Sequence, residues 1–153
     1  LDLFHNLTVC DYFFAKDKIF ASINLDDDEL ALYNSVVSAL RQFAPRPDFV
    51  IYLQASTDTL LRRIEQRGRA FEFSMDSGYI DLLNQAYNHF FFHYTESPLL
   101  IINTNEVDFV HDKGDLDELL EQIASTTVGT NYYRPMGRKA REKIAARKNQ
   151  GNP

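Results

Sequence analysis

The chain has 153 residues, of which 44% are hydrophobic and 25% charged, as expected for a globular protein with a real core. Its formal net charge is −6, although residues 134–148 contain seven basic side chains and one acid. The rest of the chain is therefore strongly acidic, and this acidic body argues against a nucleic-acid partner. A single cysteine, Cys10, excludes an internal disulfide framework and suits the cytoplasm, and no apolar run is long enough to cross a membrane.

In chain order, three short apolar runs predict buried strands over residues 7–13, 48–55 and 97–105. The second and third runs are apolar almost throughout, which is typical of central parallel strands. Helical patterns separate and follow the runs. We predict an α/β fold with an incomplete parallel sheet of about three strands flanked by helices. The predicted helices cover residues 26–43, 56–68, 76–94 and 115–126.

The sequence changes character after residue 126. Residues 126–135 are typical of an extended connector, and residues 136–153 of a basic, weakly amphipathic helix or a disordered end. We therefore expect a folded domain over residues 1–128 and a connector with a basic tail over 129–153. A solvated tail and a tail that contacts an acidic surface or a polyanion both fit this composition.

The most distinctive segment is LLRRIEQRGRAFE, residues 60–72, which contains four arginines and two acids. Arg63 and Arg67 are four residues apart and share one face of a helix. Gly68 lets the backbone leave the helix, so that Arg69 can turn toward the same side. Three converging guanidinium groups suit a phosphate, whereas a solvated basic helix face is the simpler interpretation.

The order of the motifs resembles one known family. The pattern DFVIYLQAS, then LLRRI, RGR and a glutamate, then PLLIIN, resembles the latter half of the deoxynucleoside kinases, which are P-loop kinases related to thymidylate kinases. The resemblance implies a P-loop-kinase-like sheet and transfer of the ATP γ-phosphoryl group to the 5′-hydroxyl of a 2′-deoxynucleoside. It also implies ATP and Mg²⁺ as cofactors, and a homodimer formed through helices such as residues 26–43.

The resemblance also implies roles for the arginine segment. Arg63, Arg67 and Arg69 fall on the arginines of the lid that closes over the ATP phosphates and contacts the transferring group. Glu72 falls on a carboxylate that holds the 3′-hydroxyl of the deoxyribose, although a local pair with Arg69 would also explain this acid. Arg62 lies off the shared face, and we expect it to be a surface residue.

Two aspartates near the start of the sequence receive roles by the same resemblance. Asp11, at the end of the first predicted strand, falls where the family has an acid that helps to hold magnesium. The family's next residue, an arginine, is replaced by Tyr12, and Lys16 or Lys18 could supply the missing charge. Asp17 falls near the aspartate that recognises the base, although the spacing differs by about one residue.

The loop after the third predicted strand, NTNEVDF, resembles the one that surrounds the ATP adenine, which assigns nucleotide binding to Asn105, Glu106, Asp108 and Phe109. A polar loop at this place in a parallel sheet is where a ligand binds, but any surface loop is polar as well.

The phosphate-binding motif of P-loop kinases, G-x-x-x-x-G-K-[ST], does not occur among the six glycines of the sequence. We therefore expect the chain to be the C-terminal portion of a deoxynucleoside kinase and to be inactive alone. Two alternatives stay open: a nucleoside monophosphate kinase of the thymidylate type, and a non-catalytic fragment that binds a nucleotide or a partner.

Overall fold

A computed structural model describes residues 7–69, 76–126, 128–137 and 141 of the chain. It divides into two compact units, Leu1–Pro45 and Arg46–Pro153, which are described separately below. None of the described helices is both long enough and apolar enough to pass through a bilayer.

The first unit contains two helices, α1 (Lys16–Asn24) and α2 (Asp27–Leu40), followed by the 3₁₀ turn η1 (Arg41–Phe43). The start of α2 is fixed locally, because the Asp26 carboxylate accepts from the Glu29 amide at 2.9 Å and the Glu29 carboxylate accepts from the Asp26 amide at 3.1 Å. The predicted helix over 26–43 is thus confirmed as α2 and η1, whereas α1 was not predicted.

The strand predicted over residues 7–13 is wrong. These residues have no regular secondary structure, and Leu7 and Val9 are 79% and 88% exposed. An apolar run becomes a strand only where its amide and carbonyl groups meet those of a neighbouring strand. In the described part of the chain, the sheet consists of three other strands. The position of Asp11 at the end of a strand, which supported its predicted role, is therefore also lost.

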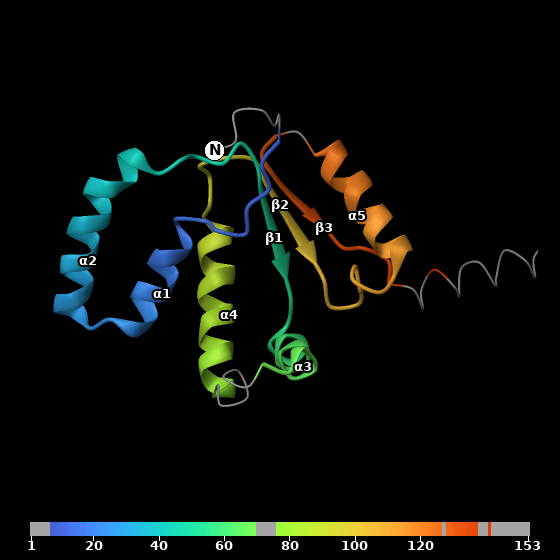
Figure 1. Cartoon of the computed structure of the whole chain (residues 1–153), viewed down its shortest axis with the longest axis horizontal. Coiled ribbons are helices and arrows are strands. Elements are labelled where there is room, and N and C mark those ends of the chain that lie inside the picture. Colours follow the sequence, from blue (N-terminus) through green and yellow to red (C-terminus); the bar gives the residue numbers. More distant parts are fainter. Residues whose placement is uncertain (1–6, 70–75, 127, 138–140, 142–153) are drawn as a thin grey trace, which may run out of the picture. The chain divides into compact units, whose positions relative to one another are not determined.

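The second unit is built on a parallel sheet of β1 (Val50–Gln54), β2 (Leu99–Asn103) and β3 (Thr130–Tyr133), in the order β1-β2-β3 (Figure 1). The strands predicted over 48–55 and 97–105 are confirmed as β1 and β2, but β1 is not the buried central strand that its sequence predicted, because it stands at the end of the described strand order and exposes Ile51 and Leu53. Strand β2 is central, and its side chains from Leu99 to Ile102 are buried on both faces, which explains its continuous apolar sequence.

Strand β3 lies within residues 126–135, for which we predicted only an extended connector. The segment is extended, but it pairs with β2 and belongs to the sheet. Its sequence, TNYY, has no apolar run because β3 is an edge strand whose side chains alternate between exposed and half-buried. The domain end that we predicted at residue 128 therefore comes just before a strand of the same sheet. The division into a folded domain over 1–128 and a connector with a tail over 129–153 stays a prediction.

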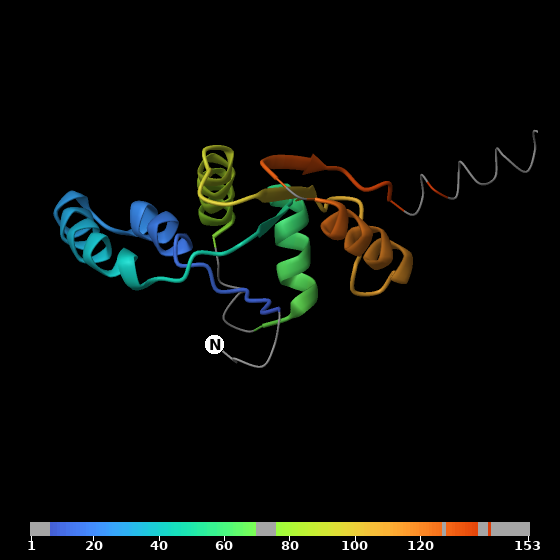
Figure 2. The ribbon, with the colours of Figure 1, turned by 90° about the horizontal axis from the view of Figure 1, so that it is seen from above.

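Helices α4 (Ser77–Phe92) and α5 (Lys113–Ser125) cover opposite faces of the sheet (Figures 1 and 2). On the α4 face, the ring of Tyr52 stacks on that of Phe91 with centroids 4.2 Å apart. On the α5 face, Leu119 forms a buried cluster with Leu100 and Ile102. Helix α3 (Thr57–Arg67) follows β1 beyond the carboxyl ends of the strands. This layered arrangement confirms the predicted α/β fold class.

Candidate functional site

Helix α3 begins and ends where the sequence predicts. The Ser56 side chain accepts from the amide of Thr59 at 3.4 Å and caps the first turn. At the other end, Gly68 has a φ of 67°, in the left-handed region that favours glycine, and it accordingly terminates the helix. Since Ser56 lies only two residues after β1, these caps place the arginines of α3 at the carboxyl edge of the sheet.

Arg63 is the half-buried arginine of this helix, and its side chain contacts the loop that follows β2. Its guanidinium donates to the hydroxyl of Thr104 at 2.8 Å, to the carbonyl of Thr104 at 2.6 Å and to the carbonyl of Val107 at 3.2 Å. Burial lowers the pKa of Arg63, and the neighbouring charge of Arg62 lowers it further. The arginine predicted to bind phosphate therefore also holds the loop after β2.

The first residues of this loop are tied to the end of β1. Thr104 donates from its amide at 2.8 Å and from its hydroxyl at 3.0 Å to the carbonyl of Gln54. The side-chain oxygen of Asn105 accepts from the amide of Ser56 at 2.8 Å, directly beside the start of α3. These bonds fix the exit of β2 relative to α3, and they give Asn105 a structural role.

Asp108 organises the second half of the loop. Its carboxylate accepts from the amides of Val110 at 3.1 Å and His111 at 3.2 Å, and it lies 2.8 Å from the Nδ1 atom of His111. The hydrogen bond from His111 is the main reason why the pKa of Asp108 is lowered. The carboxylate thus closes a turn, whereas the amide of Asp108 faces the other way and donates to Asp115 at 2.8 Å.

Helix α3, this loop and the start of α5 enclose a pocket of about 860 Å³ within the second unit. A volume of this size suits a nucleotide-sized ligand. The pocket lies at the carboxyl end of β2, where ligands bind in parallel α/β sheets. Its lining residues are Leu53, Arg62, Arg63, Gln66, Thr104, Asn105, Glu106, Val107, Asp108, Phe109, Val110, His111, Asp112, Asp115 and Gly137.

The four loop residues predicted for nucleotide binding, Asn105, Glu106, Asp108 and Phe109, line this pocket together with Arg63. Their side chains differ in surroundings. Phe109 packs against the buried cluster under α5, whereas Glu106 is largely exposed and lies 3.5 Å from Arg134.

The other arginines predicted to bind phosphate lie farther along the same segment. Arg67 is the last residue of α3, Arg69 follows Gly68, and both side chains are exposed. Their convergence with Arg63 on a phosphate stays a prediction. Glu72, predicted to hold the deoxyribose, lies outside the described residues.

The predicted residues of the first unit have contacts of their own. Asp11 is exposed, and its backbone carbonyl accepts from the Lys16 side chain at 3.0 Å. The carboxylate of Asp17 accepts from the hydroxyl of Tyr12 at 3.3 Å. The magnesium role of Asp11 and the base-recognition role of Asp17 stay predictions. Within the described ranges, no group of three His, Cys, Asp or Glu side chains could hold a metal ion.

Several pocket residues were not predicted. Arg62 is exposed, as expected for a surface residue, but it also lines the pocket together with Gln66, four residues later on α3. The spacing of Gln66, four residues after Arg62 and three after Arg63, was the available signal. Asp115 and Gly137 had no such signal, because each meets the loop through the fold and not through its local sequence.

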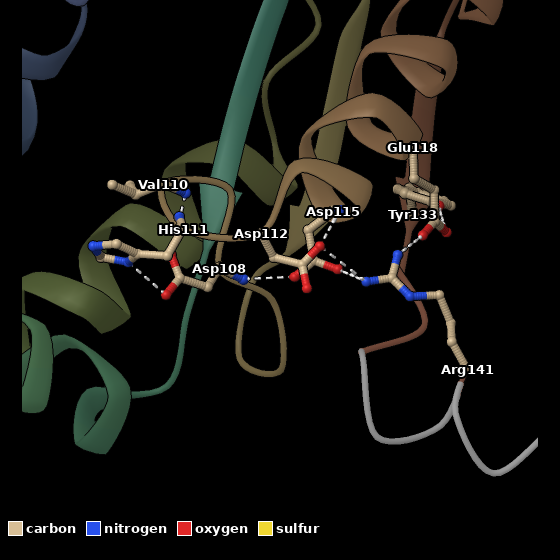
Figure 3. Close-up of polar contacts among 8 residues, drawn as sticks. All are labelled: Asp108, Val110, His111, Asp112, Asp115, Glu118, Tyr133 and Arg141. Atoms are coloured by element: carbon tan, nitrogen blue, oxygen red, sulfur yellow. Dashed lines mark hydrogen bonds and ion pairs between the residues drawn. The ribbon is translucent and has the colours of Figure 1, made fainter.

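Asp115 also belongs to a cluster of charges on α5 that includes Arg141 (Figure 3). The guanidinium of Arg141 forms an ion pair with Asp115, lies 3.0 Å from Glu118 and lies 3.8 Å from Asp112. The hydroxyl of Tyr133 donates to the other oxygen of Glu118. The cluster joins β3, α5 and the residues after β3 at the rim of the pocket.

Comparison with known proteins identifies relatives for most of the chain. The family described as "Deoxynucleoside kinase" matches residues 4–128. A deoxyguanosine kinase of Bacillus subtilis is 32% identical over 124 residues, which cover 78% of this chain and 60% of that protein. A deoxyadenosine kinase of Lactobacillus acidophilus is 32% identical over 130 residues, which cover 76% of this chain and 60% of that protein.

A solved structure, that of the deoxyadenosine kinase from M. mycoides with bound dCTP, has the same fold. Its TM-score is 0.56 at 24% identity, over 73% of this chain and 58% of that one. The chain spans about 60% of the length of the curated relatives named above. The family match covers both helices of the first unit, β1, β2 and the helices between them. The chain therefore belongs to the deoxynucleoside kinase family.

Proposed function

We propose that this chain serves an ATP-dependent deoxynucleoside kinase, which transfers the γ-phosphoryl group of ATP to the 5′-hydroxyl of a 2′-deoxynucleoside. The observation that carries this proposal is the placement of Arg63. It lines one pocket with the loop at the carboxyl end of β2, and it donates there to neutral oxygens. None of these three hydrogen bonds goes to a carboxylate, although the charge of the nearby Asp108 carboxylate acts to raise the pKa of Arg63.

Such a charge suits phosphoryl transfer. The moving group spreads negative charge over its equatorial oxygens, so catalysis depends on positioned cations. In this proposal, Arg63 supplies a fixed cation beside the nucleotide, and Arg67 and Arg69 contact the phosphates as the lid closes. Glu72 accepts a hydrogen bond from the 3′-hydroxyl of the sugar, and Asp17 faces the base. The family resemblance of the arginine segment supports these roles.

The proposed donor site is the pocket beside residues 104–109. In this proposal, backbone groups of the loop and the ring of Phe109, which lines the pocket, contact the adenine. The nucleotide's phosphates would point toward α3. Asn105, Glu106 and Asp108 act here mainly by shaping the loop, since Asn105 and Asp108 bond to backbone amides.

Magnesium enters the proposal through Asp11. Mg²⁺ is usually bound by one or two carboxylates, water and phosphate oxygens, so a single exposed carboxylate fits the chemistry of the ion. When bound with ATP, the ion would neutralise phosphate charge.

The single exposed cysteine, Cys10, fits a cytoplasmic location.

The names of the relatives guide the choice of acceptor. They include deoxyguanosine, deoxyadenosine and deoxyadenosine/deoxycytidine kinases. We therefore propose a purine deoxynucleoside as the first acceptor to test. Titration of the chain with deoxyguanosine, deoxyadenosine and their 5′-monophosphates distinguishes the acceptors. Tighter binding of the monophosphates would favour a kinase of the thymidylate type instead.

Nucleotide binding without turnover is the second candidate, because the sequence lacks the glycine-rich phosphate loop. Isothermal titration of the chain with ATP and with adenosine tests binding, and a radiolabelled ATP assay tests turnover. We expect ATP to bind and turnover to be absent. Turnover by the purified chain would refute the expectation that it is inactive alone, and the absence of ATP binding would refute the proposed donor site.

For the quaternary structure, we propose a homodimer that uses α2. The exposed faces of α2 and η1 carry Leu32, Val36, Leu40 and Phe43, with 69%, 50%, 49% and 78% of each residue exposed. Their spacing of three or four residues forms one apolar stripe. Light scattering after size exclusion should give the mass of a dimer, and Val36→Glu with Leu40→Glu should give a monomer. A monomeric wild-type chain would refute this proposal.

A further inference from the structure

Arg141 forms ion pairs with one face of α5. Asp112, Asp115 and Glu118 are spaced three residues apart on this face, and all three lie within 4 Å of the Arg141 guanidinium (Figure 3). The Arg141 side chain is 29% exposed, and that of Asp115 is 3% exposed. Arg141 is therefore partly withdrawn from water, unlike an ordinary residue of a solvated basic tail.

Asp115 connects this arginine to the loop after β2. One of its carboxylate oxygens pairs with Arg141, and the other accepts from the amide of Asp108 at 2.8 Å. A buried carboxylate is stable only when its charge is paired and its oxygens are hydrogen-bonded. Removal of Arg141 would leave Asp115 without that cation, so the carboxylate would move toward water and release the Asp108 amide.

A second, independent contact joins the same two parts of the chain. A Cβ atom at Gly137 would lie only 2.5 Å from the carbonyl oxygen of Glu106, so the two backbones touch and only glycine fits. Gly137 also lines the pocket. The segment after β3 thus supports the loop at two points, Glu106 and Asp108.

Both contacts come from residues beyond the region that matches the family, which ends at residue 128. We propose that Arg141 is a positioning residue for the loop of residues 104–109: through Asp115, and together with the Gly137 contact, it holds the loop in the shape that receives the nucleotide base. The consequence for ATP binding rests on the proposed function, whereas the effect on the loop does not.

The first experiment measures amide hydrogen exchange in the 153-residue chain. We expect Arg141→Ala to speed exchange at the Asp108 amide by about tenfold, because its acceptor is released, and to leave the amide of Leu100 in β2 unchanged. Lys113→Ala removes an exposed cation from the same helix and is the matched control. Exchange at Asp108 within about twofold of wild type in Arg141→Ala would overturn the proposal.

Gly137→Ala supplies a second variant, which keeps the Arg141 side chain and removes the close contact with Glu106. It should speed exchange at Val107 and Asp108, because the added methyl group forces the segment away from Glu106. If Arg141→Ala fails to fold, with Leu100 no longer protected, the Gly137→Ala result decides. Unchanged exchange there would overturn the proposal.

The second experiment titrates the same variants with ATP. We expect Arg141→Ala to raise the Kd for ATP by about three- to tenfold and Arg141→Lys, which keeps the charge, to recover part of this loss. The Kd for a deoxynucleoside should stay the same. If the wild-type chain binds no ATP, only the proposed function would be refuted. The proposal that Arg141 positions the loop would still be tested by the exchange result. If a variant shows faster exchange at Asp108 but unchanged ATP affinity, the proposal that the shape of this loop matters for binding the nucleotide base would be refuted.

Discussion

The loop after β2 is held from two sides by arginines in opposite electrostatic settings. On the α3 side, Arg63 donates to a hydroxyl and two carbonyls, all of them neutral. On the α5 side, Arg141 lies among three carboxylates. Both side chains are partly buried and lie far from the loop in the sequence, but Arg63 contacts the loop directly, whereas Arg141 acts on it through Asp115.

The difference separates an arginine that can act on a ligand from one that supports the structure. Dipolar partners hold the Arg63 guanidinium in place, and the nearby Asp108 carboxylate offsets its charge without appearing among these three hydrogen-bond partners, so an anion in the pocket would still be attracted. The carboxylates around Arg141 cancel its charge locally, and its effect is transmitted through Asp115. A single basic side chain thus has a different use according to the partners that the fold supplies.

The largest expected effect is that of Arg63→Ala. The substitution removes three hydrogen bonds to the loop and the cation beside the pocket, so we expect a loss of about 1–3 kcal/mol in the free energy of unfolding. ATP affinity should fall more than tenfold, by analogy with other phosphate-binding arginines, or about 1.4 kcal/mol. Urea unfolding and ATP titration measure the two effects, with exposed Glu65→Ala as control. Unchanged ATP affinity would show that Arg63 is only structural.

A double substitution tests whether the two sides support one unit. If Arg63 and Arg141 hold the same loop, the loss of stability in Arg63→Ala with Arg141→Ala should differ from the sum of the single losses by about 0.5 kcal/mol or more. Urea unfolding of the four proteins gives this coupling energy. Additive losses would mean that each arginine holds its own half of the loop.

Salt should distinguish the two sides. Raising the ionic strength from about 0.1 M to about 1 M shortens the Debye length from about 10 Å to about 3 Å. The stability lost in Arg141→Ala should therefore shrink at high salt, because partly exposed ion pairs are screened, whereas the loss in Arg63→Ala should change little. Denaturation with urea at both ionic strengths measures this. Equal responses of the two variants would contradict the distinction drawn above.

The smallest effect concerns alkaline pH and acts on the α5 side. Burial, and then the hydrogen bond to Glu118, raise the pKa of Tyr133 from 10.0 to about 12. The folded chain therefore keeps this proton after the unfolded chain has lost it. The contribution of the protonated Tyr133 to the free energy of unfolding is complete below pH 10 and is lost as the pH rises toward 12. Tyr133→Phe should flatten the decline of stability over this range, and an unchanged slope would show that other groups cause it.

The local elements could be read from the sequence because their causes are local. Asp26 with Glu29, Ser56 and Gly68 lie within a few residues of the helix ends that they define. The apolar sequence of β2 likewise reports burial on both faces of the sheet, whereas Ile51 and Leu53 of the equally apolar β1 are exposed. The strand predicted over residues 7–13 failed for the complementary reason, because an apolar run does not supply its own strand partner. Conversely, β3 formed from a less apolar sequence because β2 provides a strand for it to pair with.

The site divides in the same way. The arginine segment and the loop at residues 103–109 were recognisable from the sequence by their composition and their resemblance to a family, and the structure places Arg63 and the loop around one pocket. The contact of Arg63 with Thr104 spans 41 residues, and that of Arg141 with Asp115 spans 26. Composition alone left two interpretations of the tail open, a solvated tail and one that contacts an acidic surface or a polyanion. Only the tertiary structure could show that Arg141 returns to α5, because no local pattern specifies which carboxylate a distant cation meets.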